Sequence, residues 1–171
     1  QEDKPSQLET IASSRYEPKH NVYTTRAHTL YEKDEEAWFS VGRHLFDKED
    51  YAKNNSHRYT LSAIDPVENG ILTVVFTGSS PTSNRVNINF NDTVPFSFVV
   101  AGNSDEYIKA TEAKRTYELD TLFEGGTPAN INVHIRSEAG KRARLDYLSY
   151  SYDRKLSVTT TNYIEFRATE N

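Results

Sequence analysis

The stretch Arg142-Ala-Arg-Leu-Asp-Tyr-Leu-Ser-Tyr-Ser-Tyr-Asp-Arg154 decides the fold of this chain. Successive side chains of a β-strand point to opposite faces, so the stretch divides into two sets. One set contains Leu145, Tyr147, Ser149 and Ser151, and the other contains Ala143, Asp146, Leu148, Tyr150 and Tyr152. Leucine and tyrosine favour pleated, half-buried positions. The pattern therefore predicts a long strand that is covered on both faces.

Asp146 is the acidic residue among these aromatic side chains. A carboxylate at such a position resembles a catalytic group, but a buried carboxylate is stable only when it is paired. We therefore expect Asp146 to be a structural acid, with Arg144 or nearby backbone N–H groups as its partners.

Short segments of similar alternation occur along most of the chain. The apolar run 71–77 predicts a central strand that is buried on both faces. In two other segments the inward side chains are Val86, Ile88 and Phe90, and Ile131, Val133 and Ile135. The remaining predicted strands are 22–31, 38–46, 57–64, 95–101, 107–110 paired with 114–119, 155–158 and 163–167.

About ten short strands separated by polar turns, with no convincing helix, are typical of an antiparallel β-sandwich. The spacing of the segments favours the jelly-roll type, which makes this an all-β protein. Residues 1–20 are polar and are expected to form a flexible leader, followed by a single β-sandwich domain over residues 21–171.

The composition excludes several classes of function. The chain has 171 residues, a net charge of -5 and no cysteine, so it can contain neither a disulfide nor a cysteine nucleophile. The acidic balance argues against a nucleic-acid partner, which would require a basic face. The sequence predicts no transmembrane segment, since no apolar run approaches the ~20 residues needed to cross a bilayer. The chain also lacks methionine, and we expect a mature product or a piece of a longer protein.

Candidate chemical groups are present without a catalytic or metal-binding spacing. The five histidines are His20, His28, His44, His57 and His134. Acidic residues in predicted turns, which favour turn capping over Ca²⁺ binding, are Asp65, Asp92, Asp105 and Glu106. Trp38, Tyr51 and Tyr107 could stack on a sugar ring, although core burial is the more common role of a single tryptophan. We therefore predict no catalytic, cofactor-binding or metal-binding residue in this chain.

Four stretches together carry a resemblance to a known family. They are residues 26–34, the sequence Ser40-Val-Gly-Arg-His-Leu-Phe-Asp47, residues 143–156 and the closing Ile164-Glu-Phe-Arg167. Their order and spacing resemble the β-sandwich domain that precedes the peptidase domain in PorU-type gingipain-family cysteine peptidases, the type IX secretion sortases. The second stretch departs from the family pattern, because an aromatic residue and a second glycine are replaced.

This resemblance implies a non-catalytic accessory module of an exported protein at the bacterial cell surface or outer membrane. Its partners would be a downstream peptidase domain of the same parent chain, or cargo or components of type IX secretion. The catalytic cysteine and histidine of the family lie in that downstream domain, so no catalytic residue carries over to this chain.

The element Leu145-Asp146-Tyr147 also resembles the last strand of jelly-roll carbohydrate-binding modules. That resemblance implies an alternative function, glycan binding or adhesion through aromatic side chains on loops or on a concave face.

Overall fold

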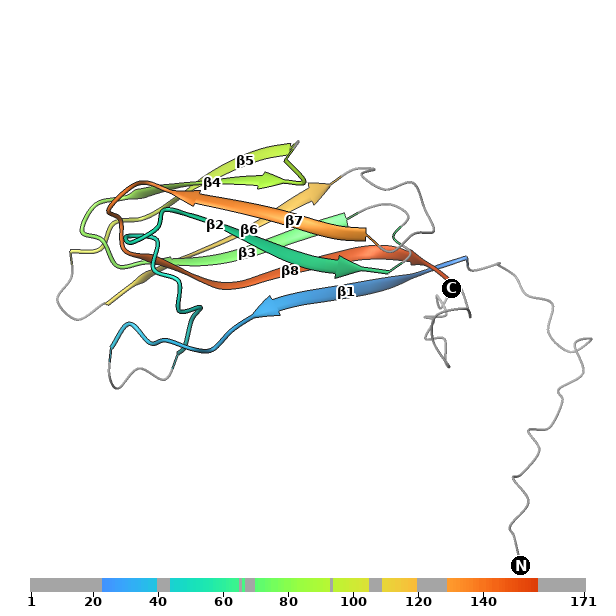
Figure 1. Ribbon diagram of the computed structural model, residues 1–171, viewed down its shortest axis with the longest axis horizontal. Helices are drawn as coiled ribbons and strands as arrows, with labels where there is room; N and C mark the ends of the chain where they lie inside the picture. Colours follow the sequence, from blue (N-terminus) through green and yellow to red (C-terminus); the bar gives the residue numbers. More distant parts are fainter. Residues whose placement is uncertain are drawn as a thin grey trace, which may run out of the picture.

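The computed structural model describes residues 23–39, 44–64, 66, 70–92, 94–104, 109–119 and 129–156. These residues form eight β-strands and no helix (Figure 1). The strands are β1 (Thr24–Glu32), β2 (Ser56–Ala63), β3 (Gly70–Gly78), β4 (Asn84–Phe90), β5 (Val94–Val100), β6 (Thr111–Leu119), β7 (Ala129–Ser137) and β8 (Ala143–Lys155).

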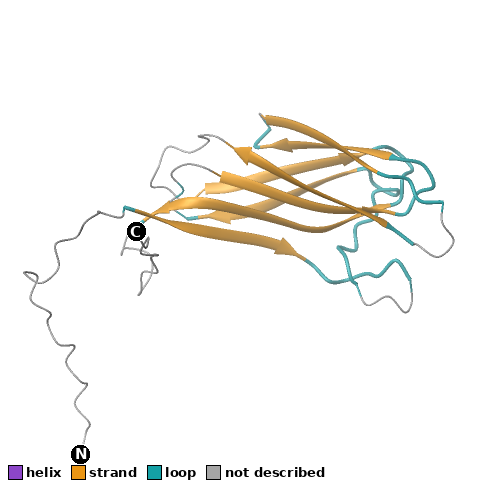
Figure 2. Ribbon diagram, turned by 180° about the vertical axis from the view of Figure 1, so that it is seen from behind, coloured by secondary structure: helices purple, strands orange, loops and turns teal. Residues whose placement is uncertain are grey.

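The strands form two four-stranded antiparallel sheets that face each other. One sheet has the order β1-β8-β3-β6 and the other β2-β7-β4-β5. Strands consecutive in sequence therefore lie mostly in opposite sheets, which is the double Greek-key arrangement of a jelly roll. The predicted all-β jelly-roll fold is confirmed. Most of the described loop residues lie at one end of the sandwich (Figure 2).

The core lies between the sheets and follows directly from the alternation of the strands. In β4 the inward side chains Val86, Ile88 and Phe90 are buried while the residues between them are exposed, as predicted. The predicted inward residues of β7, Ile131, Val133 and Ile135, are also buried. Each such side chain contributes roughly 1.5–3 kcal/mol through removal of apolar surface from water.

The central strand β8 contains a β-bulge that the sequence pattern did not reveal. Val75 of β3 pairs with Tyr147, but the next residue of β3, Phe76, pairs with Leu145, so Asp146 is the extra residue. A bulge resets the alternation of a strand. Leu145 consequently faces the core together with Ala143, and its assignment to the opposite face was wrong.

The face of β8 that points away from the core is only half-buried, so the prediction that both faces are covered was wrong for this strand. The outward side chains are small or polar, as at Ser149 and Ser151, and solvent reaches them. In β3 the second half is buried on both faces, as predicted, whereas Ile71 and Thr73 are half-buried.

The predicted strand 38–46 does not form in the described residues. Glu36 and Phe46 make an isolated bridge, and the described residues between β1 and β2 form no further strand. Residues 40–43 lie outside the described residues. The physical reason is that the edge of β8 beyond the end of β1 is used instead by the residues that follow this segment. The backbone N–H groups of Asp47 and Tyr51 donate to the carbonyl groups of Leu145 and Ala143 at 3.0 Å.

The predicted pairing of 107–110 with 114–119 is also wrong. Thr111–Leu119 is one continuous strand, and its partner is β3 rather than a preceding hairpin arm. Residues 105–108 lie outside the described residues, as do the predicted leader 1–20 and the predicted strands 155–158 and 163–167, apart from residues 155 and 156.

Candidate ligand-binding face

The outer face of the sheet β2-β7-β4-β5 carries polar side chains that point away from the core. In β4 these are Arg85, Asn87 and Asn89, which alternate with the buried apolar residues. In β7 the equivalent positions are Asn130, Asn132, His134 and Arg136. Side chains at directly paired positions of neighbouring strands lie next to one another.

The register of the strands arranges these side chains in two rows that cross the sheet. Asn87 pairs with Ser97 of β5 on one side and with Arg136 of β7 on the other. Two residues along β4, Asn89 pairs with Pro95 and with His134. Because paired residues have Cβ atoms about 4.5–5.5 Å apart, each row is a continuous ladder of side chains.

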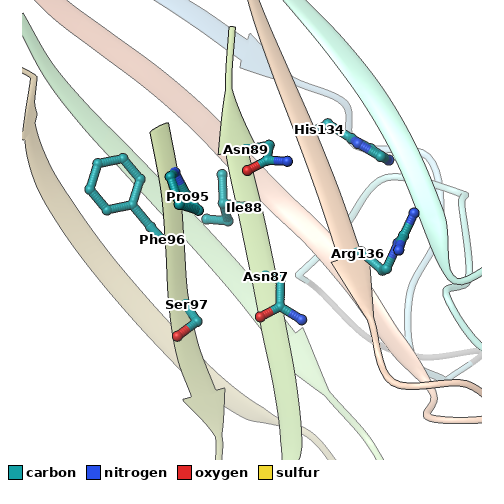
Figure 3. A pocket seen from close by; sticks show the side chains of 8 residues that line it. All are labelled: Asn87, Ile88, Asn89, Pro95, Phe96, Ser97, His134 and Arg136. Atoms are coloured by element: carbon teal, nitrogen blue, oxygen red, sulfur yellow. The ribbon is translucent and has the colours of Figure 1, made fainter. Parts of the chain in front are cut away.

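A hollow of about 370 Å³ lies over these two rows. It is lined by Asn87, Ile88, Asn89, Pro95, Phe96, Ser97, His134 and Arg136 (Figure 3). Figure 3 shows these residues following β5, β4 and β7 in turn, with Phe96 pointing away from Asn87, Asn89 and Arg136. The volume is within the range of small-molecule sites, and it opens to solvent.

Three side chains of the hollow have no partner among the described residues. Asn87, Asn89 and Arg136 make no side-chain hydrogen bond or ion pair with any described residue. Together they offer amide donors and acceptors and a forked guanidinium donor over neighbouring strands. Such an array can bind the hydroxyl groups of a polar ligand without rearranging the protein.

His134 is held in place by a neighbouring strand. Its Nε2 lies 2.5 Å from the Oγ of Ser56 in β2, which fixes the orientation of the ring. Burial, together with the positive charges of Arg58 and Arg136, lowers the pKa of His134 below its ordinary value. The lowered pKa favours the neutral imidazole, which can donate a hydrogen bond at one ring nitrogen and accept one at the other.

The other histidines are not gathered into a site. His28 is exposed on the edge strand β1, and His57 contacts the backbone carbonyl of Asn54 at 2.8 Å. His20 lies outside the described residues. The described part of the chain contains no group of three histidine or acidic side chains that could hold a metal ion.

Of the four acidic residues predicted to lie in turns, Asp92 is in the described part of the chain. Asp92 lies in the β4–β5 turn, where Asn91 and Asp92 have φ values of 47° and 58°, and it pairs with Arg58 at 3.1 Å. The predicted turn at these residues is confirmed. Asp65, Asp105 and Glu106 lie outside the described residues.

The aromatic candidates differ in exposure. Tyr51 is fully buried, and its hydroxyl lies 3.0 Å from that of Tyr59, so it belongs to the core. Trp38 is half-buried on the outer side of the other sheet, where its Nε1 donates to the hydroxyl of Thr77 at 3.1 Å. The guanidinium groups of Arg142 and Arg144 lie 5.2 and 5.3 Å from its ring centre. Tyr107 lies outside the described residues.

Asp146 is buried, and its partner is His44 rather than Arg144. The Nε2 of His44 lies 3.2 Å from Oδ1 of Asp146, whereas Arg144 donates to the backbone carbonyl groups of Asp47 and Lys48. The predicted partner was therefore wrong. Burial raises the pKa of the Asp146 carboxyl, and the nearby His44 partly opposes this effect.

The hollow was not predicted from the sequence, although part of its signal was visible. The outward positions of Asn87 and Asn89 and the polar position of His134 could be read from alternation. The adjacency of β4 and β7 could not, because these strands are distant in sequence and pair only through the jelly-roll crossover. Outward side chains rich in amides, on two strands, are the signal that could have indicated the site.

Comparison with known proteins gives similarity in structure alone. No family model matches the chain, and no curated protein matches it. Dimeric latent PorU from Porphyromonas gingivalis aligns with a TM-score of 0.65 at 12% identity, over 81% of this chain and 13% of that chain. At this identity the alignment shows a shared fold, and the chain spans only that small share of PorU.

Carbohydrate-binding modules align less closely. A family 35 module from Cellvibrio japonicus gives a TM-score of 0.45 at 10% identity, over 81% of this chain and 96% of the module. A second family 35 module, in complex with a disaccharide that contains glucuronic acid, gives 0.45 at 12% identity, over 80% of this chain and all of the module. The described residues include no helix that is both long and apolar enough to cross a membrane.

Proposed function

We propose that this protein is a jelly-roll carbohydrate-binding module that holds a glycan on the outer face of β2-β7-β4-β5. The observation that supports the proposal is the hollow in which Asn87, Asn89 and Arg136 lie side by side, without side-chain partners in the part of the chain that the structure describes. Sugars present closely spaced hydroxyl groups, and amide and guanidinium groups bind such hydroxyls with two hydrogen bonds at a time.

The rest of the hollow suits the same ligand. Pro95 is exposed at one wall and offers an apolar ring to the C–H face of a sugar. Neutral His134 and the hydroxyl of Ser97 add further donors and acceptors. Phe96 lines the hollow but points away from Asn87, Asn89 and Arg136, so recognition would rest on hydrogen bonds more than on stacking.

The test is a glycan array followed by titration calorimetry of the best ligand with single variants. We expect Asn89→Ala to weaken binding about tenfold, since one good hydrogen bond in a binding site is worth about 1.4 kcal/mol. The matched control is Thr116→Ala, a polar side chain exposed on the other sheet, which should bind as the parent does. Absence of binding to every glycan, or equal binding by Asn89→Ala, would refute the proposal.

A second candidate is an accessory module of a PorU-type cysteine peptidase, which braces the peptidase domain or docks cargo outside the cell. The observation that favours it is the alignment with PorU over 81% of this chain. The gene supplies the test: we expect the reading frame to continue beyond Asn171 into a segment with a cysteine and histidine pair. A stop codon shortly after Asn171 would eliminate this candidate.

A further inference from the structure

The outer face of β2-β7-β4-β5 differs in charge from the rest of the molecule. Its outward strand positions carry three arginines, Arg58, Arg85 and Arg136, and no aspartate or glutamate. The whole chain has a net charge of -5, so the concentration of positive charge on this face is local.

The arginines differ in their partners. Arg58 is paired with Asp92 of the β4–β5 turn. Neither Arg85 nor Arg136 has an acidic side chain within ion-pair distance among the described residues. Arg136 alone of these two lines the hollow, next to Asn87 and His134.

We infer that the ligand of this face is an anionic glycan, with a carboxylate or sulfate group bound by the guanidinium of Arg136. This inference rests on the proposed function and adds the chemical class of the ligand. A guanidinium presents a planar fork of N–H donors that matches two oxygens of a carboxylate or sulfate at once. The unpaired charge of Arg136 is complementary to such a group, and the amides of Asn87 and Asn89 would bind the hydroxyls of the same sugar.

The pKa of the neighbouring histidine reflects the charges of the same arginines. The positive charges of Arg58 and Arg136 contribute to the lowered pKa of His134, after burial. The two arginines, opposed in part by the carboxylate of Asp92, therefore give a positive potential at the imidazole, which lines the hollow. An anion placed there would be stabilised by the same potential.

The inference can be tested with the full chain and matched pairs of ligands. A uronic acid oligomer is compared with the same oligomer after chemical reduction of its carboxyl groups to alcohols, and with a sulfated neutral oligomer. We expect the uronate or the sulfated ligand to bind at least about tenfold more tightly than the reduced ligand, and salt to weaken this preference.

Single variants test whether Arg136 causes the preference for the anionic ligand. Arg136→Gln should lose at least about tenfold in affinity for the anionic ligand and less than about twofold for the reduced one. Lys114→Gln is the control, because it removes one positive charge from an exposed position on the other sheet. Its binding should equal that of the parent.

The outcomes separate the two proposals. Equal binding of the charged and reduced ligands would overturn the inference and leave the proposed function standing. An equal loss in Arg136→Gln and Lys114→Gln would also overturn it, because net charge alone would then explain the effect. No binding of any glycan would overturn both. Preference for sulfate over carboxylate would support the inference and identify the anion.

Discussion

The outer faces of the two sheets are used in different ways. On β1-β8-β3-β6, the loop between β1 and β2 lies against the end of the sheet, where Trp38 bonds to Thr77 and Phe46 is buried. Val75, which also points outward there, is only 2% exposed. On β2-β7-β4-β5, Asn87 and Asn89 are exposed, and their side chains bond to none of the described residues.

The contrast shows that one chain can give its two sheets different outer surfaces, one covered in part by a loop and one open to solvent. The long loop adds a small second layer of packing to one sheet, in which His44 stacks on Phe46 with ring centres 4.5 Å apart. The other sheet receives no such cover from the described residues. A polar ligand can therefore reach its strands directly, and we expect changes on the two faces to affect different properties.

The largest expected effect is on the covered face. Val75→Asp would bury a carboxylate without a partner and should lower the free energy of unfolding by more than about 4 kcal/mol. Asn87→Asp also introduces a carboxylate, but at an exposed position of the open face, and should alter the free energy of unfolding by less than about 0.5 kcal/mol. Urea denaturation measures both. Equal destabilisation of the two variants would remove the distinction between the faces.

A smaller effect is expected from truncation of the covering layer. Trp38→Ala removes a half-buried ring, its hydrogen bond to Thr77 and its contacts with Arg142 and Arg144. We expect a loss of about 2 kcal/mol, less than for a fully buried tryptophan. Glycan binding on the opposite face should be unchanged. A Trp38→Ala protein that unfolds at the parent's urea midpoint would show that the loop does not stabilise the sheet.

The smallest expected effects are on the pH dependence of stability, and they have opposite signs on the two faces. The raised pKa of Asp146 means that the folded state holds this proton more tightly than the unfolded state. Stability from this group falls as pH rises just above the ordinary carboxyl value of about 3.9. The lowered pKa of His134 means that stability from this group falls as pH drops below about 6.5.

Thermal melts of Asp146→Asn and His134→Gln between pH 3 and 8 check both signs. The Asp146→Asn protein should gain stability relative to the parent as pH rises through the acidic range. The His134→Gln protein should lose less stability than the parent on acidification below neutral pH. The reverse order in either variant would contradict the assigned direction of that pKa shift.

Alternation along single strands was enough to predict the sandwich and the inward residues of β4 and β7. It failed where a residue's environment depends on partners distant in sequence. The pairing of Asp146 with His44 joins β8 to a loop about a hundred residues earlier in the chain, which no local pattern records. The predicted strand at 38–46 failed for a related reason, since alternation does not show whether an edge is available for pairing.

The candidate site likewise combines features that single strands predict with features that depend on the order of the strands in the sheet. The polar character of Asn87 and of Arg136 could be read separately, but their juxtaposition requires the order β7-β4 within the sheet. That order is a property of the jelly-roll topology. A site formed across non-consecutive strands therefore needs the topology before its residues can be grouped.

The bulge at Asp146 has a consequence for changes in chain length. Removal of one residue from the interior of a regular strand moves every following side chain to the opposite face. In β8 the extra residue already interrupts the alternation. Deletion of Asp146 would leave Ala143, Leu145, Leu148 and Tyr150 alternating without interruption, all directed to the core. The interior strand β8 thus contains a position at which this fold can lose a residue and keep its register.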